Sequence, residues 1–375
     1  MKQLVVIFTL WLAWMPVGAQ KTLTLEECLK LGIENNLSLE GSRNEMRKAK
    51  HLLSENRAKL WPQISAVAGF NDNFNPPVSV TDGSAYGNLY NVTKTLQYNA
   101  SAGLQLQMPL YNQTVYTAVD IARTLNELNR LSYEKAREDL MMQISKMYYL
   151  GQNTMEQLTL IQENMVRLRE LRDITLAFFD NGMAMEVDVK RVNINLENQQ
   201  VQYDNAKSML VQQLNLLKYV MDYPADEEIT LTPVDTERIQ SVSLTGLRSD
   251  LYELQLLQSQ EKLAGQQKDL IRQGYLPSLT LTGSWMYSAY TDKARHWFHS
   301  GPSNHWYPST GLGITLRVPI FDGFDKRARI RKAQIDQENA RLNYENTLKN
   351  MQTQYLNATN EQMNNQRNFK IQKDY

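Results

Sequence analysis

The sequence NQTVYTAVDIARTLNELNRLSYEKAREDLMMQISKMYYLGQ (residues 112–152) begins a stretch that runs to Met221 without a proline and with only two glycines, Gly151 and Gly182. Proline breaks helices, so its absence over about 110 residues favours helix. Apolar residues recur at spacings of three and four on both sides of Gly182, as in the seam of a coiled coil. The stretch therefore predicts two long helices that pack against each other.

The break between the two helices is predicted at Asp180-Asn181-Gly182. Asn and Gly tolerate the left-handed conformation that ends many helices. Glu186 and Asp188 then follow in the first turn of the next helix, where negative charge suits the helix dipole. At 1.5 Å per residue, the first arm of this hairpin is roughly 100 Å long. Such an arm cannot fold back into a compact domain and must pack on neighbours.

Outside the hairpin the period changes from helical to two. Apolar and polar residues alternate in predicted strands at about residues 62–74 and 98–110, with a polar loop between them. The alternating runs 64–71 and 98–108 contain no charge. Each strand has about 10 to 12 residues, which is long enough to cross a bilayer at a tilt. The composition of the strands therefore favours a transmembrane sheet.

The same pattern occurs a second time. LWPQI (residues 60–64) aligns with YLPSL (275–279), and LQMPLYN (106–112) aligns with LRVPIFD (316–322), whose last residues, Asn112 and Asp322, are predicted helix caps. We interpret residues 21–235 as the first repeat and 236–375 as a second, incomplete one. The second repeat contains predicted strands at about 277–290 and 309–320 and a helix from 322.

Residues 1–20 resemble a secretory signal, with a basic start at Lys2, an apolar core and a small-residue cleavage site. Cys28 is the only cysteine, which excludes an intrachain disulfide, and we expect its small side chain to be buried or partly buried. The 40 basic and 40 acidic residues balance, so net charge gives no argument for nucleic acid. No catalytic, phosphate-binding or metal-binding motif is found, which indicates a protein without cofactor that is not an enzyme.

Four strands cannot close a barrel, because the smallest membrane barrels have about eight. An open sheet in lipid would leave its edge groups without hydrogen-bond partners, at a cost of several kcal/mol per group. Strands that enter a membrane must therefore pair between copies of the chain. Three copies would give twelve strands, and the long helices would continue that barrel as a helical cylinder.

These features resemble the TolC-like family of outer-membrane efflux proteins over essentially the whole mature chain, C-terminally shortened. The resemblance is carried by the tandem repeat, by VPIFDG (residues 318–323), by LPSL (276–279) with its partner 61–64, and by the turn NGMAMEVDV (181–189). It implies an α+β membrane protein: a trimeric 12-stranded β-barrel with four strands per chain, continued by an α-helical coiled-coil tunnel.

The resemblance also implies a location and partners. The barrel would lie in the outer membrane of a Gram-negative bacterium, with the tunnel projecting into the periplasm. The protein would be a passive exit duct of a tripartite efflux or type I secretion system, supplied by a periplasmic adaptor and an inner-membrane RND or ABC pump. Three alternatives remain: a periplasmic coiled-coil adaptor, a coiled-coil structural protein, or a truncated channel without function.

Three sets of residues are candidates for function. The resemblance places an adaptor-docking tip at Asp180, Asn181, Gly182 and Met183. The aromatic residues near strand ends or on apolar faces would form a membrane-interface girdle or pack within the sheet: Trp61, Tyr98, Tyr111, Tyr275, Trp285, Tyr287 and Phe321. Lumen candidates are Gln105, Gln107 and Arg317; Arg317 would tune ion preference or form an ion pair near the barrel–tunnel junction.

Histidines are the remaining candidates. His296, His299 and His305 occur in one loop, where a metal site is conceivable, but an exposed extracellular loop is favoured because the segment has no cysteine and few acids. His51, alone in a predicted helix, is interpreted as a structural or surface residue.

Overall fold

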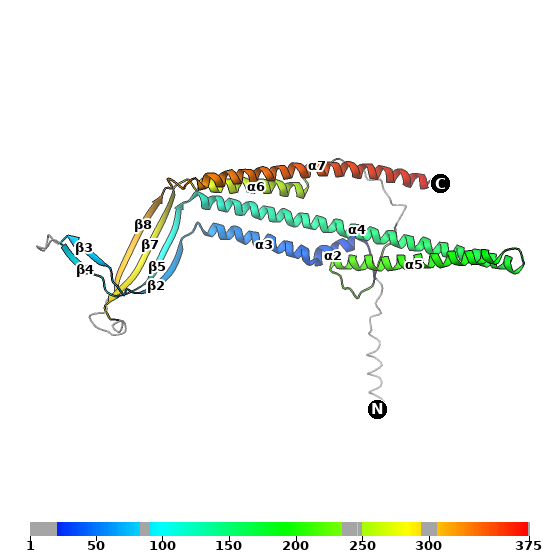
Figure 1. Cartoon of the computed structure of the whole chain (residues 1–375), viewed down its shortest axis with the longest axis horizontal. Coiled ribbons are helices and arrows are strands. Elements are labelled where there is room, and N and C mark those ends of the chain that lie inside the picture. The colour runs from blue at the N-terminus through cyan, green and yellow to red at the C-terminus, as the bar shows by residue number, and fades with distance from the viewer. Residues whose placement is uncertain (1–20, 83–89, 235–245, 247–249, 294–305, 374–375) are drawn as a thin grey trace, which may run out of the picture. The chain divides into compact units, whose positions relative to one another are not determined.

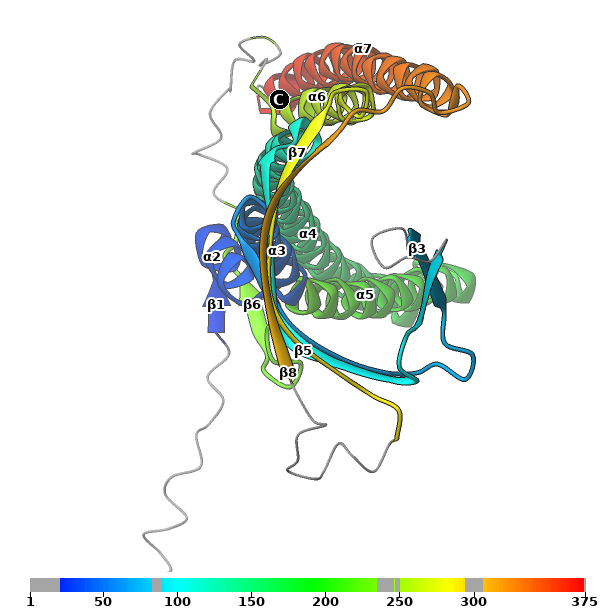
Figure 2. The same cartoon turned by 90° about the vertical axis from the view of Figure 1, so that its left-hand side faces the viewer.

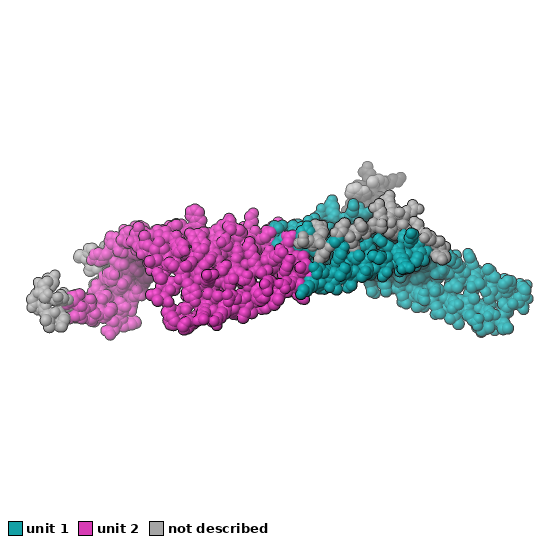
Figure 3. All heavy atoms as spheres, turned by 90° about the horizontal axis from the view of Figure 1, so that it is seen from above, with its two compact units in different colours: residues 1–46, 129–253, 349–375 teal, residues 47–128, 254–348 magenta. Residues whose placement is uncertain are grey.

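The computed structural model describes residues 21–82, 90–234, 246, 250–293 and 306–373, and the chain divides into two compact units. Unit 1 contains residues 1–46, 129–253 and 349–375, and unit 2 contains residues 47–128 and 254–348 (Figure 3). In chain order (Figure 1), the elements in the described ranges are β1 (Lys21–Leu23), α2 (Leu25–Asn35), α3 (Leu37–Ala58), β2 (Gln63–Asp72), β3 (Val78–Asp82), β4 (Tyr90–Lys94), β5 (Tyr98–Tyr111), α4 (Gln113–Asp180), α5 (Glu186–Met221), β6 (Ile229–Leu231), α6 (Tyr252–Gln273), β7 (Ser278–Thr291), β8 (Trp306–Arg317) and α7 (Asp325–Lys373).

The predicted order of helix, strand, strand and long helix occurs twice, first as α3, β2, β5 and α4 and then as α6, β7, β8 and α7. The long helical hairpin is confirmed: α4 has 68 residues and α5 has 36. The predicted signal at residues 1–20 lies outside the described residues. In the part of the chain that the structure describes, no helix is both long and apolar enough for a membrane span.

The strands of the two copies meet in one antiparallel sheet within unit 2, in the order β2-β5-β7-β8. Its strands are 10 to 14 residues long. Because β5 pairs with both β2 and β7, the central contact joins the first copy to the second. The sheet is curved (Figure 2), and β2 and β8 form its two edges.

Two strand pairs were not predicted. The segment predicted as a polar loop contains the hairpin β3–β4, in which Val80 pairs with Val92. The β-branched residues Val78, Val80 and Thr81, close together in the sequence, were the missed signal. In unit 1, β1 and β6 pair in parallel, with Leu23 opposite Leu231. Two strands of three residues so far apart in the chain leave no local pattern to detect.

Side chains next to the sheet fix the starts of two helices in unit 2, as predicted. The Asn112 Oδ1 atom accepts a hydrogen bond from the Thr114 N–H at 3.1 Å. At the corresponding place in the second copy, Asp322 Oδ2 accepts one from the Lys326 N–H at 3.3 Å, in the first turn of α7, and Oδ1 accepts one from the Phe324 N–H just before that helix at 3.1 Å. These caps satisfy backbone donors that the first turn of a helix leaves free. They fix the start of α4 directly after β5, and the start of α7 a few residues after the end of β8.

The core of unit 1 lies where α2, α4, α5 and the β1–β6 pair meet. Its fully buried side chains include Leu23, Cys28, Ile144, Leu217, Met221 and Leu231. Tyr148 donates its hydroxyl hydrogen bond to the Leu23 carbonyl at 3.2 Å. Cys28 is buried as predicted, and this burial raises the pKa of its thiol to about 11.

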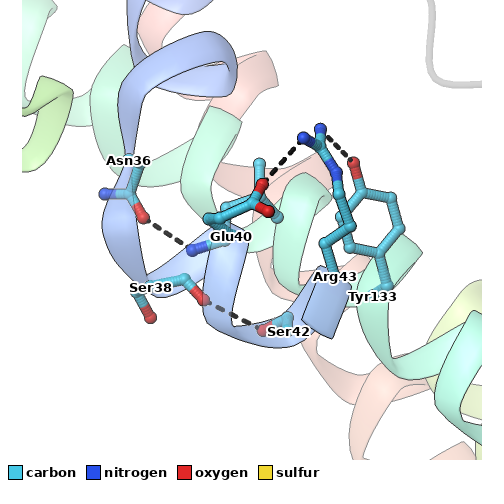
Figure 4. Close-up of polar contacts among 7 residues, drawn as sticks. Asn36, Ser38, Glu40, Ser42, Arg43 and Tyr133 are labelled. Atoms are coloured by element: carbon cyan, nitrogen blue, oxygen red, sulfur yellow. Dashed lines mark hydrogen bonds and ion pairs between the residues drawn. The ribbon is translucent and has the colours of Figure 1, made fainter. Parts of the chain in front are cut away.

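Polar contacts fix the joint between α2 and α3 (Figure 4). Asn36 stands between the two helices: its Oδ1 atom accepts from the Leu39 N–H at 2.9 Å, and its Nδ2 atom donates to the Val220 carbonyl at 2.8 Å. One turn further along α3, Arg43 bridges Glu40 at 2.8 Å and the Tyr133 hydroxyl at 3.3 Å. The joint therefore ties α2 and α3 to α5 and α4 within unit 1.

Candidate functional site

The turn of the α4–α5 hairpin is a compact, glycine-terminated helix end. Gly182 has a φ of +73°, in the left-handed region. Its N–H donates to the Phe179 carbonyl at 2.9 Å, and the Met183 N–H donates to the Phe178 carbonyl at 2.7 Å. This pair of bonds is the Schellman motif, which glycine favours because it has no Cβ. The local sequence thus fixes the geometry of the turn.

The predicted tip residues Asp180, Asn181, Gly182 and Met183 are all exposed at this turn. The exposed apolar surface is wider than predicted, since Met183 is 69% and Met185 72% exposed. The residues that sequence reasoning missed are the exposed apolar neighbours Phe178, Phe179, Met185 and Val187. Apolar side chains that gather at an exposed helix turn were the available signal. Such a patch suits contact with another protein, and methionine adapts its shape easily.

The four-stranded sheet has one polar face. In β5, Gln105 lies between Ser65 and Ser284, and two residues along the strand Gln107 lies between Gln63 and Thr282. Glycines of β8, Gly311 and Gly313, complete these two rows. Arg317 belongs to the same face and pairs with Ser278 at the end of the sheet next to α7. The structure therefore brings the three lumen candidates to one face.

The opposite face of the sheet is apolar. In one row of this face, Leu104 of β5 pairs with Ala66 of β2 and with Trp285 of β7. In the next row, Leu106 pairs with Ile64 and with Gly283, and Gly283 in turn pairs with Leu312 of β8. Leu312 is 77% exposed and Ile314 is 65% exposed within the chain. A contiguous exposed apolar face marks contact with protein or membrane. The two unlike faces of one sheet are the arrangement that a barrel wall between lipid and water requires.

The predicted aromatic residues lie in three places on the sheet. Trp61, Tyr111, Tyr275 and Phe321 lie at or just beyond the strand ends that join helices, and the Tyr275 ring is 5.0 Å from Lys326 Nζ. Tyr98 lies at the other end, with its ring 6.2 Å from that of Phe70. Trp285 and Tyr287 contact each other on the apolar face, with ring centroids 5.7 Å apart. Phe70 and Trp306, on the same face, were missed.

The prediction for the loop histidines, an exposed loop in preference to a metal site, falls outside the described residues and stays a prediction. His296, His299 and His305 lie outside them. In the described ranges, no group of three or more His, Cys, Asp or Glu side chains is placed to hold a metal ion. His51 is exposed on α3, which agrees with a surface residue.

Comparison with known proteins gives a family. The profile described as "Outer membrane efflux protein" matches residues 29–221 and 250–375. "Outer membrane protein TolC" of Vibrio cholerae is 23% identical over 325 residues, which are 83% of this chain and 68% of that protein. "Probable efflux pump outer membrane protein TtgC" of Pseudomonas putida is 22% identical over 335 residues, which are 86% of this chain and 65% of that protein. The chain thus spans about two thirds of these relatives.

Solved structures share the fold. The crystal structure of CusC matches with a TM-score of 0.72 at 17% identity, over 92% of this chain and 78% of that chain. The outer membrane protein VceC of Vibrio cholerae matches with a TM-score of 0.67 at 14% identity, over 86% and 75% of the two chains. The predicted fold class, strands joined to long helices as in outer-membrane channels, is therefore confirmed.

Proposed function

The chain belongs to the outer membrane efflux protein family, and on this basis we propose that three copies of it form an outer-membrane channel. The channel is a passive exit duct of a tripartite efflux or type I secretion system. An inner-membrane RND or ABC pump and a periplasmic adaptor deliver the cargo. The protein catalyses no reaction and uses no cofactor.

One observation carries this proposal: the sheet has unlike faces and two unpaired edges. β2 and β8 pair with no further strand within the described residues. Pairing β8 of one copy with β2 of the next satisfies both edges, and three copies close a barrel of twelve strands. The apolar face with Leu104 then meets lipid, and the polar face with Gln105, Gln107 and Arg317 lines the lumen. The aromatic residues at the two ends of the strands lie toward the membrane interfaces, whereas Trp285 lies near the middle of the apolar face.

The hairpin tip has a second role in this proposal. Asp180, Asn181, Gly182 and Met183, together with the exposed apolar residues around them, dock onto the adaptor. The rigid Schellman turn supports this role, because a preformed surface loses little conformational freedom on binding. The alternatives, a periplasmic adaptor or a soluble coiled-coil protein, do not explain a sheet of membrane length with an exposed apolar face.

The assembly is tested by the mass of the mature chain after detergent extraction from outer membranes, measured by light scattering with the detergent contribution subtracted. We expect three times the mass of one chain. We also expect the purified trimer to produce stepwise ion conductance in planar lipid bilayers. A monomer without conductance would refute the proposal and leave the truncated-channel alternative.

The docking role is tested by Met183→Asp in a strain that lacks the native gene. A carboxylate buried without a partner costs about 3–5 kcal/mol, which weakens adaptor binding by about 100-fold or more. We expect efflux-dependent resistance to be lost while the trimer persists. Met209→Asp is the matched control, because Met209 is an exposed methionine of α5 away from the turn. Full resistance with Met183→Asp would exclude this tip as the docking surface.

A further inference from the structure

The polar face of the sheet is almost free of charge. Between the strand ends, its residues are amides, hydroxyls, glycines and a few apolar side chains, as the rows through Gln105 and Gln107 illustrate. In the described strands of this sheet, Arg317 is the only residue of this face with a formal charge. A single cation on an otherwise neutral wall dominates the electrostatic potential around it.

The backbone pairing fixes the side of the sheet to which Arg317 belongs. It is the last residue of β8 and pairs with Ser278, while its neighbour Leu316 pairs with Leu279 on the apolar face. Arg317 is exposed. A guanidinium group stays protonated at any physiological pH. The charge at this position is therefore permanent.

The nearest acids in the sequence do not neutralise this charge. Asp322 accepts hydrogen bonds from Phe324 and forms an ion pair with Lys326 at 3.2 Å. Asp325 lies 3.6 Å from Arg329. Among the described residues, Arg317 itself forms no ion pair. Both acids thus face cations of their own helix turn, and Arg317 keeps its full positive charge.

We propose that Arg317 gives the channel a preference for anions, as a ring of three guanidinium groups at the end of the barrel next to the helical tunnel. This inference rests on the trimeric channel proposed above. The favoured solutes are small inorganic anions and cargo with carboxylate, phosphate or sulfate groups, which guanidinium binds through paired hydrogen bonds. Cationic solutes are repelled at the same level.

The expected size of the effect follows from the geometry of twelve strands. Strands about 4.8 Å apart and tilted by about 40° give a backbone radius of about 12 Å. An extended arginine reaches about halfway to the axis, so three charges lie about 6 Å from it. In water with a Debye length of about 8 Å, they favour an anion on the axis about fivefold over a neutral solute. In 1 M salt this preference falls below about twofold.

The experiment measures reversal potentials of purified trimers in planar bilayers under a KCl gradient, near 0.15 M and again at 1 M. The wild-type channel is expected to favour chloride at low salt. In Arg317→Gln the chloride-to-potassium permeability ratio is expected to fall at least about threefold, whereas Arg317→Lys is expected to retain it. At 1 M the variants and the wild type are expected to converge.

One control and two distinct outcomes separate this inference from the proposed function. Each variant is first shown to have the trimer mass of the wild type and, at 1 M KCl, its unit conductance. Wild-type trimers that do not conduct would refute the channel itself. Channels that conduct, but with the same reversal potential in wild type and Arg317→Gln at low salt, would overturn the role of Arg317 and leave the channel intact.

Discussion

Replacing Gly103 by alanine is expected to abolish assembly of the proposed trimer. Gly103 lies in β5, where it pairs with Val67 on one side and Met286 on the other. A Cβ atom at this position would lie 2.2 Å from the Trp285 carbonyl oxygen and 2.7 Å from the Met286 Cα atom. Both contacts are with backbone, so no change of rotamer relieves them. The substitution therefore has to push β5 away from β7.

Separating β5 from β7 lowers the stability of the sheet by a large amount for the addition of a single methyl group. Overpacking costs about 1–3 kcal/mol in ordinary cores, and here the β5–β7 ladder that joins the two repeats is disrupted as well. The yield of trimer after detergent extraction and its melting temperature measure the effect. Gly69→Ala is the matched control, because its Cβ would lie at an ordinary 3.5 Å from Ser101 Oγ on the neighbouring strand pair. Equal yields and melting temperatures for the two variants would contradict the register of the sheet.

The second large effect is expected for Leu104→Lys. Leu104 lies on the apolar face between Ala66 and Trp285, near the middle of the sheet. A lysine on the lipid face of a barrel costs about 2–4 kcal/mol at the bilayer midplane. We therefore expect poor insertion into the outer membrane and a lower free energy of unfolding in lipid vesicles, measured by denaturant titration.

The matched control for Leu104→Lys is its neighbour in the same strand, Gln105→Lys. The side chains of adjacent strand residues lie on opposite faces, so in the proposed barrel this lysine meets the water of the lumen at nearly the same depth. Its stability is expected to stay within about 1 kcal/mol of the wild type. If Gln105→Lys were the more damaging of the two substitutions, the assignment of lipid and lumen faces would be reversed.

Local patterns predicted the parts of the fold that neighbouring residues determine. The helical hairpin followed from the proline-free stretch, and the glycine turn followed from Asn181 and Gly182. The caps Asn112 and Asp322 were also read correctly, because a cap acts within a few residues. The parallel β1–β6 pair was not predicted, since neither strand has a pattern of its own. The two strands can be recognised only from the folded core around Leu23, where they pair.

The candidate sites show the same limit. The tip was predicted from its turn residues, but the apolar surface around it also includes Phe178, Phe179 and Met185, which belong to the helices and not to the turn. The alternation in β8 placed Arg317 on a polar face. Arg317 is the only charged residue on that face of the described sheet. This follows from the register of all four strands, and no single segment of the sequence contains that register.

The β1–β6 pair also constrains the order in which the chain folds. The hydroxyl groups of Thr22 and Thr230 form a hydrogen bond of 3.2 Å, although the two residues are 208 positions apart in the sequence. Closing so long a loop costs about 5 kcal/mol of chain entropy. The α4–α5 hairpin lies inside that loop and holds Tyr148 and Met221 in one cluster. It therefore acts as a template that brings the two strands within reach. The three residues of β1 therefore stay unpaired until the chain as far as β6, at Ile229–Leu231, is present and the hairpin has formed.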